Sequence, residues 1–226
     1  KDAIGEVANI SMGSSATTLY SLVNRKVNIT TPVVTLATWK TLLDSYEKPC
    51  VFIQIKYTKG LDGTNILVLK EHDVKVITDL MMGGDGTNTE GELGELHLSA
   101  ISEAMNQMMG ASSTALAEFL GMGIDISTPT PYILSEVNIA DLQNYEQTDM
   151  VAAINFDLTI DGVIKSEFIS VLDIDLAATL ADRMIGGATS PEPIATEPAP
   201  APAPAPQPVP QAEPVQQAAP VQQATP

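Results

Sequence analysis

The chain contains nearly the same sequence twice, and this internal repeat limits the folds that it can form. DAIGEVAN at residues 2–9 matches SAISEAMN at residues 99–106, an offset of 97 positions. At the same offset Gly13 meets Gly110 and Pro32 meets Pro129. After a further shift of six residues, DLMMGG at 79–84 matches DRMIGG at 182–187. We therefore expect a duplicated structural unit with a small insertion in its second copy.

Each copy is predicted to contain a helix, three strands and a second helix. The hydrophobic periodicity predicts helices at 1–24, 71–82, 92–120 and 173–185, and strands at 26–38, 49–58, 65–70, 124–134, 150–160 and 163–172. A half of this size cannot cover its own sheet face, so the two halves must cover each other. We expect an α+β fold in which long helices pack on an antiparallel sheet about a pseudo-twofold axis. Repeat one would span about 1–90 and repeat two about 91–190, together one domain.

Beyond residue 190 the composition changes abruptly. Twelve of the 16 prolines fall in residues 191–226, a segment without aromatic, Lys or Arg residues. Such a segment buries too little apolar surface to offset the entropy of ordering, and alternating Ala-Pro favours an extended chain. We expect a disordered linker, and we expect the sequence to be a fragment of a longer protein.

Charge and cysteine content narrow the possible partners. Acidic residues outnumber basic ones 28 to 11, for a net charge of −17, and such a surface repels nucleic-acid phosphates and anionic lipids. Cys50, the only cysteine, lies in the apolar run CVFIQI and is predicted to be a buried strand thiol. A chain that cannot form an internal disulfide fits a reducing cytoplasm. We expect no nucleic-acid partner and no membrane insertion.

The repeated phrase forms a polar stripe on each predicted helix. Helical geometry places its residues within about 60° of one another, with Ile and Met residues mainly on the other side. The two stripes consist of Asp2, Glu6, Asn9 and Gly13, and of Ser99, Glu103, Asn106 and Gly110. A glycine inside an exposed stripe costs about 1 kcal/mol relative to alanine, which suggests that another molecule approaches the backbone there. A solvated helix face, or a glycine needed where helices cross, is the alternative.

The spacing of the stripe and the proline is specific. Each copy reads Asp or Ser, three residues, Glu, two residues, Asn, 22 residues, and Pro. This pattern resembles the signature of the CheC, CheX and FliY family of response-regulator phosphatases, and the resemblance covers residues 2–187. The family removes the aspartyl phosphate of phosphorylated CheY.

The resemblance implies roles for the residues of both stripes. Asn9 and Asn106 would hold the attacking water, while Glu6 and Glu103 would pair with the active-site lysine of the partner. The remaining stripe residues would contact the partner: Asp2, Gly13, Ser99 and Gly110. Pro32 and Pro129 would shape the strand behind each helix. The chain would need no cofactor of its own, because the response regulator carries the Mg²⁺.

The Pro-rich segment resembles the FliY branch of the family in particular. There a linker leads to a FliN-like domain that assembles with FliM and FliG, at a cytoplasmic location on the flagellar switch. Relative to full-length FliY, we expect the N-terminal CheY-binding peptide and the FliN-like domain to lie outside this sequence. Two alternatives stay open: a scaffold that binds phosphorylated CheY without hydrolysing it, and a free-standing CheC-like phosphatase. Retention of both Asn residues favours catalysis, since docking alone does not require an amide.

Other candidate sites are weak. His72 and His97 have no second His or Cys at metal-ligand spacing, so we expect structural or solvated roles. GGDGTNTEGE lacks the carboxylate positions of a calcium loop and is interpreted as a linker between the repeats. Trp39 is expected to be a packing residue. The motifs GxxxxGK[ST] and GxSxG are absent, which argues against nucleotide and serine hydrolases.

Overall fold

The computed structural model describes residues 1–46, 49–134 and 146–186. In chain order the elements are α1 (Asp2–Val23), β1 (Val27–Thr38), α2 (Trp39–Asp44), β2 (Cys50–Lys59), β3 (Gly63–Lys70), α3 (Glu71–Met81), α4 (Glu95–Leu120), β4 (Asp125–Ile126), β5 (Thr130–Leu134), β6 (Met150–Ile160), β7 (Ile164–Asp173) and α5 (Ile174–Gly186). The predicted linker at 191–226 lies outside the described residues. No helix in the described part of the chain is long and apolar enough to cross a membrane.

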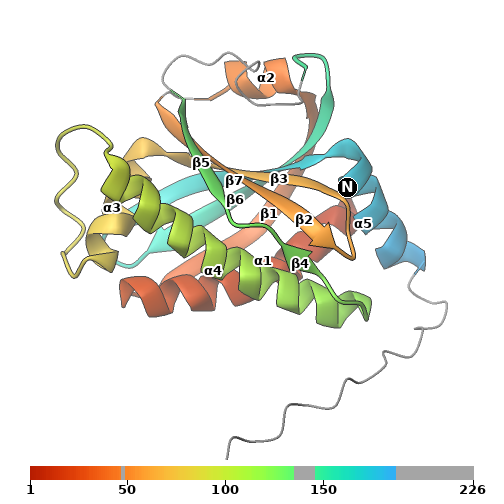
Figure 1. Cartoon of the computed structure of the whole chain (residues 1–226), viewed down its shortest axis with the longest axis horizontal. Coiled ribbons are helices and arrows are strands. Elements are labelled where there is room, and N and C mark those ends of the chain that lie inside the picture. Colours follow the sequence, from red (N-terminus) through yellow and green to blue (C-terminus); the bar gives the residue numbers. More distant parts are fainter. Residues whose placement is uncertain (47–48, 135–145, 187–226) are drawn as a thin grey trace, which may run out of the picture. The chain divides into compact units, whose positions relative to one another are not determined.

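One curled antiparallel sheet holds the described strands (Figure 1). Its order is β1-β6-β7-β3-β2-β4, and β5 also pairs with β2. The hairpins β2–β3 and β6–β7 meet at the centre, where β3 pairs with β7. The first strand of each repeat pairs with the hairpin of the other repeat: β1 with β6, and β4 and β5 with β2. The two repeats are therefore interlocked, so neither can form its complete sheet alone.

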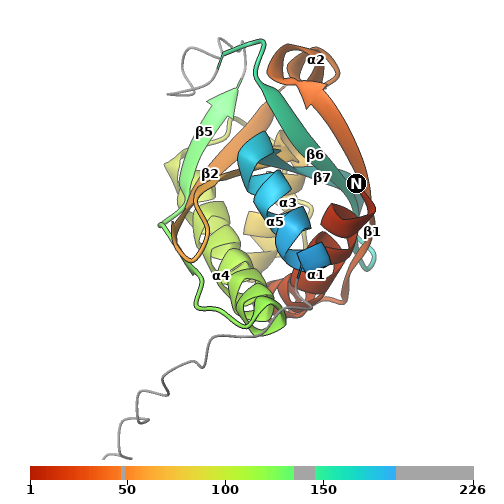
Figure 2. The ribbon, with the colours of Figure 1, turned by 90° about the vertical axis from the view of Figure 1, so that its right-hand side faces the viewer.

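Helices α1 and α4 lie side by side against one face of this sheet (Figure 2). Their buried positions repeat at the offset of 97 found in the sequence. The equivalent buried pairs are Ile4 and Ile101, Val7 and Ala104, Ala8 and Met105, Ser11 and Met108, Met12 and Met109, Ser15 and Ser112, and Leu19 and Leu116. This agreement confirms the predicted fold class of helices packed on an antiparallel sheet.

Both long helices end in the same way. Asn24 has φ 50° and its backbone N–H donates to the carbonyl of Tyr20, while Gly121 has φ 65° and donates to the carbonyl of Ala117. Asn24 and Gly121 are equivalent positions, and asparagine and glycine are the residues that most readily adopt this left-handed conformation. The two long helices therefore end at equivalent positions of the repeat.

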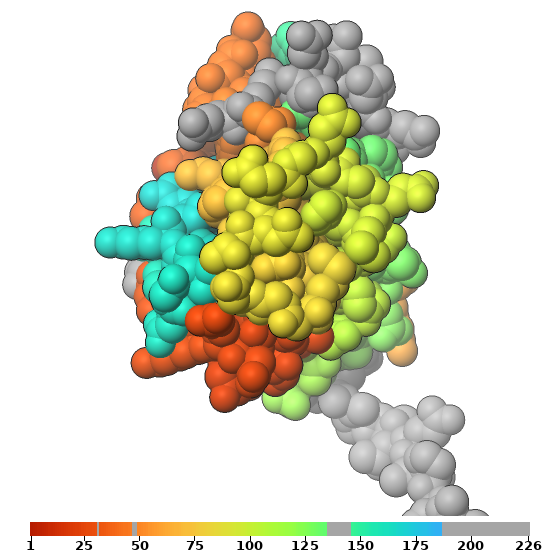
Figure 3. Space-filling view, turned by 90° about the vertical axis from the view of Figure 1, so that its left-hand side faces the viewer, coloured from red at the N-terminus to blue at the C-terminus, as the bar shows by residue number. Residues whose placement is uncertain are grey.

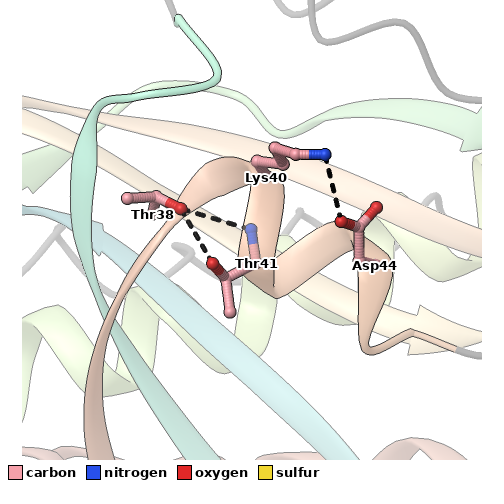
Figure 4. Close-up of polar contacts among 4 residues, drawn as sticks. All are labelled: Thr38, Lys40, Thr41 and Asp44. Atoms are coloured by element: carbon pink, nitrogen blue, oxygen red, sulfur yellow. Dashed lines mark hydrogen bonds and ion pairs between the residues drawn. The ribbon is translucent and has the colours of Figure 1, made fainter.

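The opposite face of the sheet is covered in part by α2, a helix that the periodicity did not predict. Thr38 caps it, because its Oγ1 accepts a hydrogen bond from the backbone N–H of Thr41 at 3.3 Å (Figure 4). Trp39 is buried and packs against Phe52, with ring centroids 6.4 Å apart. Cys50 is buried in the same cluster. The expected packing role of Trp39 and the buried position of Cys50 are both confirmed.

Helix α3 and residues 83–94 (yellow) cover the end of the molecule where α1 finishes (Figure 3). Asp79 holds this connection: its Oδ2 accepts the backbone N–H of Gly86 at 2.8 Å, and its carbonyl accepts that of Gly84 at 2.9 Å. The segment is thus a linker between the repeats, as predicted. Helix α4 starts at Glu95 rather than at residue 92.

The two prolines of the motif interrupt the strands beside the long helices. The register of β1 against β6 shifts between Thr30 and Val33, on either side of Pro32. In the second repeat the strand is divided, and Pro129 lies between β4 and β5. Proline lacks the N–H that a sheet ladder needs, so it favours a bulge or a break. These positions are consistent with the predicted role of the prolines in shaping the strands.

Candidate functional site

The predicted stripe of the first repeat lies on the surface of α1. Asp2, Glu6, Asn9 and Gly13 are exposed, whereas Ile4, Val7, Ala8 and Met12 are buried beneath them. The polar and apolar sides of the helix therefore separate as the periodicity predicts. The hydrogen-bonding and charged groups of the stripe are available to a second molecule.

An open groove of about 340 Å³ lies between this stripe and the neighbouring strand. Its residues come from the start of the chain, from α1 and from β1: Lys1, Asp2, Gly5, Glu6, Asn9, Pro32 and Val34. A Cβ atom on Gly5 would lie 3.7 Å from Cγ2 of Val34, so helix and strand are in contact at the base of the groove. The motif thus joins residues distant in sequence, because Pro32 faces the same groove as Asn9.

The second stripe has the same order on α4 but differs in detail. Ser99 and Glu103 are exposed, whereas Asn106 and Gly110 are half-buried. The Nε2 of Gln107 donates a hydrogen bond to Oε1 of Glu103 at 2.7 Å. In the first repeat the position equivalent to Gln107 is Ile10, which has no such donor. The two sites are therefore related but not identical.

A second difference lies in the strands behind the helices. Pro32 is half-buried and lines the groove, while Pro129 is buried. Figure 2 shows β1 beside α1 and β5 beside α4, so the two sites lie on opposite flanks of the helix pair.

Neither glycine of the stripes is required by the packing of the described chain. A Cβ atom placed on Gly13 or on Gly110 meets no atom within 4 Å. The alternative that these glycines are needed where helices cross therefore has no support in this structure. The space beside both glycines is open, so another molecule can approach the helix backbone there.

The carboxylates of the stripes form no ion pair among the described residues, although Lys1 lines the same groove as Asp2 and Glu6. The ion pairs there are Lys40 with Asp44, Lys59 with Asp125, and Lys75 with Glu71. Glu6 and Glu103 take part in none of them, and both are exposed. Each carboxylate is free to accept a cationic group from another molecule.

The histidines and possible metal ligands do not form a site in the described ranges. His, Cys, Asp and Glu nowhere gather there in groups of three or more suited to a metal ion. The Nδ1 of His97 accepts the backbone N–H of Gly94 at 3.2 Å, at the start of α4, so the expected structural role of His97 is confirmed. The expectation that the chain has no cofactor of its own stays a prediction.

Comparisons with known proteins match the same two helices of the chain. The profile of the CheC-like family matches residues 1–36 and 96–133, which hold both helices and both prolines of the motif. The crystal structure of FliY from Thermotoga maritima is 40% identical and covers 82% of this chain and 96% of that one, with a TM-score of 0.74. The chain belongs to the CheC-like family.

Two curated relatives of this CheC-like chain carry functional names. The flagellar motor switch phosphatase FliY of Bacillus subtilis is 38% identical over 198 residues, which are 88% of this chain and 52% of the relative. The CheY-P phosphatase CheC of the same organism is 28% identical over 133 residues, which are 57% of this chain and 63% of the relative. The chain therefore spans only about half to two thirds of the length of these curated relatives.

The groups in the groove can position other molecules through hydrogen bonds and charge. A neutral amide both donates and accepts hydrogen bonds, and a carboxylate one helical turn away can hold a cation. The sequence predicted the amide of Asn9 and the carboxylate of Glu6 as site residues, but it did not predict Val34 as part of the groove. Val34 lies two residues after Pro32 and lines the same groove. This position becomes informative only once the strand is known to contact the helix.

Proposed function

We propose that the chain hydrolyses the aspartyl phosphate of phosphorylated CheY, with one active site in each repeat. The observation that carries this proposal is that Asn9 and Glu6 lie in one open groove, facing Pro32. Asn106 and Glu103 have the same spacing on α4. The names of the FliY and CheC relatives support the same activity.

The reaction requires one well-placed water molecule. Its oxygen attacks the phosphorus in line with the bond to the aspartate oxygen. That bond breaks, which leaves an aspartate carboxylate and inorganic phosphate, and the proton of the water passes to the phosphate or to solvent. Phosphoryl transfer depends mainly on positioning and electrostatics, so the phosphatase needs no nucleophile of its own. In our proposal Asn9 and Asn106 hold the water through their side-chain amides.

The glutamates orient the partner. Glu6 and Glu103 are exposed and take part in no ion pair among the described residues. Each would pair with the active-site lysine of CheY and align the phosphate with the amide one turn away. The exposed Asp2 and Ser99 would add contacts at the N-terminal end of each stripe.

The remaining features of the proposal concern the setting. The Mg²⁺ of the reaction would be held by CheY, where it neutralises charge on the phosphate. The whole protein would lie in the cytoplasm at the flagellar switch, where its partners would be FliM, FliG and a FliN-like domain. The FliY relative is named a flagellar motor switch phosphatase, and this name supports the setting.

The test is phosphate release from phosphorylated CheY in the presence of this chain. We would compare it with Asn9→Ala, Asn106→Ala and the double variant, with Thr17→Ala as a control on the exposed side of α1. We expect each single variant to retain the activity of the other site. The double variant should bind CheY normally and release phosphate at the spontaneous rate of CheY.

Two outcomes would contradict the proposal. If the double variant keeps the full rate, the Asn residues are not the water-holding groups. If the unaltered chain binds phosphorylated CheY but never accelerates release, the stripes are a docking surface and the scaffold alternative is correct.

A further inference from the structure

We propose that Leu36 and Ile133 are a matched pair of apolar contacts for the response regulator, one beside each site. This inference rests on the proposed function and extends it from the reacting groups to the surface that recognises the partner. Leu36 and Ile133 are equivalent positions at the offset of 97 residues. Both are large apolar side chains that remain exposed, Leu36 at 45% and Ile133 at 42%.

On β1, Leu36 continues the wall of the first groove. Val34 pairs with Ile154 and Leu36 pairs with Ala152, and both partners belong to the core beneath the helices. Side chains of cross-strand pairs share a face, so Val34 and Leu36 both lie on the helix side of the sheet. Val34 lines the groove. Leu36 is the next residue on that face, about 7 Å farther along the strand.

On β5, Ile133 lies on the same helix side of the sheet, in the repeat that carries the second stripe. Pro131 pairs with Ile53 and Ile133 pairs with Val51, and both partners lie in the core under the helices. Ile133 thus follows Pro129 at the same interval at which Leu36 follows Pro32. The strand was divided by the proline in this repeat, yet the exposed apolar position was retained.

Single exposed apolar residues are common on protein surfaces and need no function. Here the placement is the argument, because Leu36 follows Val34 of the first groove on the helix side of the sheet, and Ile133 holds the equivalent position in the second repeat. A partner seated with its phosphate at Asn9 would cover the neighbouring helix and strand. An exposed leucine in that footprint, on the strand that packs beside the helix of Glu6, gives an apolar anchor in addition to the charged contact.

Leu36 has a matched control on the same strand. Val33 is more exposed, at 61%, but pairs with Asn155 on the other face of the sheet. If surface hydrophobicity in general promotes binding, replacing Val33 should weaken binding as much as replacing Leu36. If Leu36 is an anchor in the footprint of the partner, only the replacement of Leu36 should weaken binding.

The experiment reads one site at a time in the full chain. In an Asn106→Ala background only the first site acts, and Leu36→Ser should raise KM for phosphorylated CheY about tenfold while kcat stays unchanged. Val33→Ser should leave both constants unchanged. In an Asn9→Ala background, Ile133→Ser should have the same effect on the second site. Binding of CheY carrying beryllofluoride, a stable phosphoryl mimic, should weaken by the same factor.

The outcomes separate this inference from the function on which it rests. An unchanged KM for Leu36→Ser, or an equal rise for Val33→Ser, overturns the anchor while the asparagine variants still test catalysis. A fall in kcat at constant KM also overturns it, because that result indicates a distorted strand. If the double asparagine variant remains fully active, the proposed function fails, and the binding measurement then decides about the anchor by itself.

Discussion

The Oγ of Ser15 donates a hydrogen bond to the carbonyl oxygen of Met108 at 2.9 Å, and this contact joins the two helices that carry the sites. Ser15 is fully buried. Its small side chain lets α1 and α4 approach closely, and its hydroxyl is satisfied by the neighbouring helix.

Ser15 therefore gives the first prediction. Ser15→Ala should lower the free energy of unfolding by about 1 kcal/mol, because it removes one intramolecular hydrogen bond. Ser15→Val should cost about 1–3 kcal/mol, because extra methyl groups must be forced into a closely packed contact. Urea denaturation measures both, with the exposed Ser21→Ala as the control. A Ser15→Val protein as stable as Ser15→Ala would mean that the helices are not closely packed there.

Gly13 and Gly110 give a second prediction, in which stability and activity move in opposite directions. Alanine at either position meets no atom within 4 Å, so each substitution should stabilise the protein by about 1 kcal/mol through better helix propensity. If CheY approaches the backbone there, the same substitutions should lower kcat/KM for phosphorylated CheY.

The control for this pair is Thr17→Ala, one turn beyond Gly13 on the same exposed face. It should leave kcat/KM unchanged. Alanine variants that are more stable and equally active would remove the argument that these glycines admit a partner. Thermal unfolding and phosphate release from the same preparations supply both quantities.

The sequence predicted local structure better than long-range pairing. Helices α1 and α4 and the two hairpins were predicted because their periodicity is a local property. Helix α2 was missed because its six residues hold less than two turns of pattern, and its start depends on one cap at Thr38. The pairing of β1 and β5 with the hairpin of the other repeat was not predicted either. Local sequence patterns do not indicate which hairpin a strand will pair with.

The same division applies to the candidate site. Glu6 and Asn9 could be found because they lie on one helix, where spacing alone fixes their direction. Val34 and Leu36 belong to the same flank only through the contact of β1 with α1, which periodicity does not encode. The difference between the two sites also needed the structure, because Gln107 matters only once its amide is seen to reach Glu103.

Asp73 gives a third prediction, on pH dependence. Burial raises the pKa of the Asp73 carboxyl above its usual range, although a hydrogen bond with Ser166 and the charges of Lys70 and His72 act in the opposite direction. The folded state then binds a proton more readily than the unfolded state. The contribution of the protonated Asp73 carboxyl to the free energy of unfolding is fully present below its pKa in the unfolded state. It is lost as the pH rises through its pKa in the folded state.

Asp73→Asn removes this titration. Relative to the unaltered protein, the variant should gain stability as the pH rises from about 4, near the ordinary pKa of aspartate, to 7. Urea midpoints at several pH values measure the difference. Leu176 occupies the equivalent buried position in the second repeat, which indicates that an uncharged side chain fits there. The exposed Asp182→Asn is the control, and a difference independent of pH would contradict the assignment.

Gln107 and Ile10 give a fourth prediction, which uses the unequal sites as controls for each other. The hydrogen bond from Gln107 holds the Glu103 carboxylate in one orientation, whereas Glu6 has only Ile10 at the corresponding position. Such a pair on a helix is worth about 0.2–0.5 kcal/mol, or up to about twofold in binding. In an Asn9→Ala background, Gln107→Ile should raise KM for phosphorylated CheY up to about twofold. In an Asn106→Ala background, Ile10→Gln should lower KM by a similar factor.

Since both changes keep the helix intact, the free energy of unfolding should move by less than about 0.5 kcal/mol. Changes of the same sign at both sites would mean that the amide does not act by orienting the glutamate.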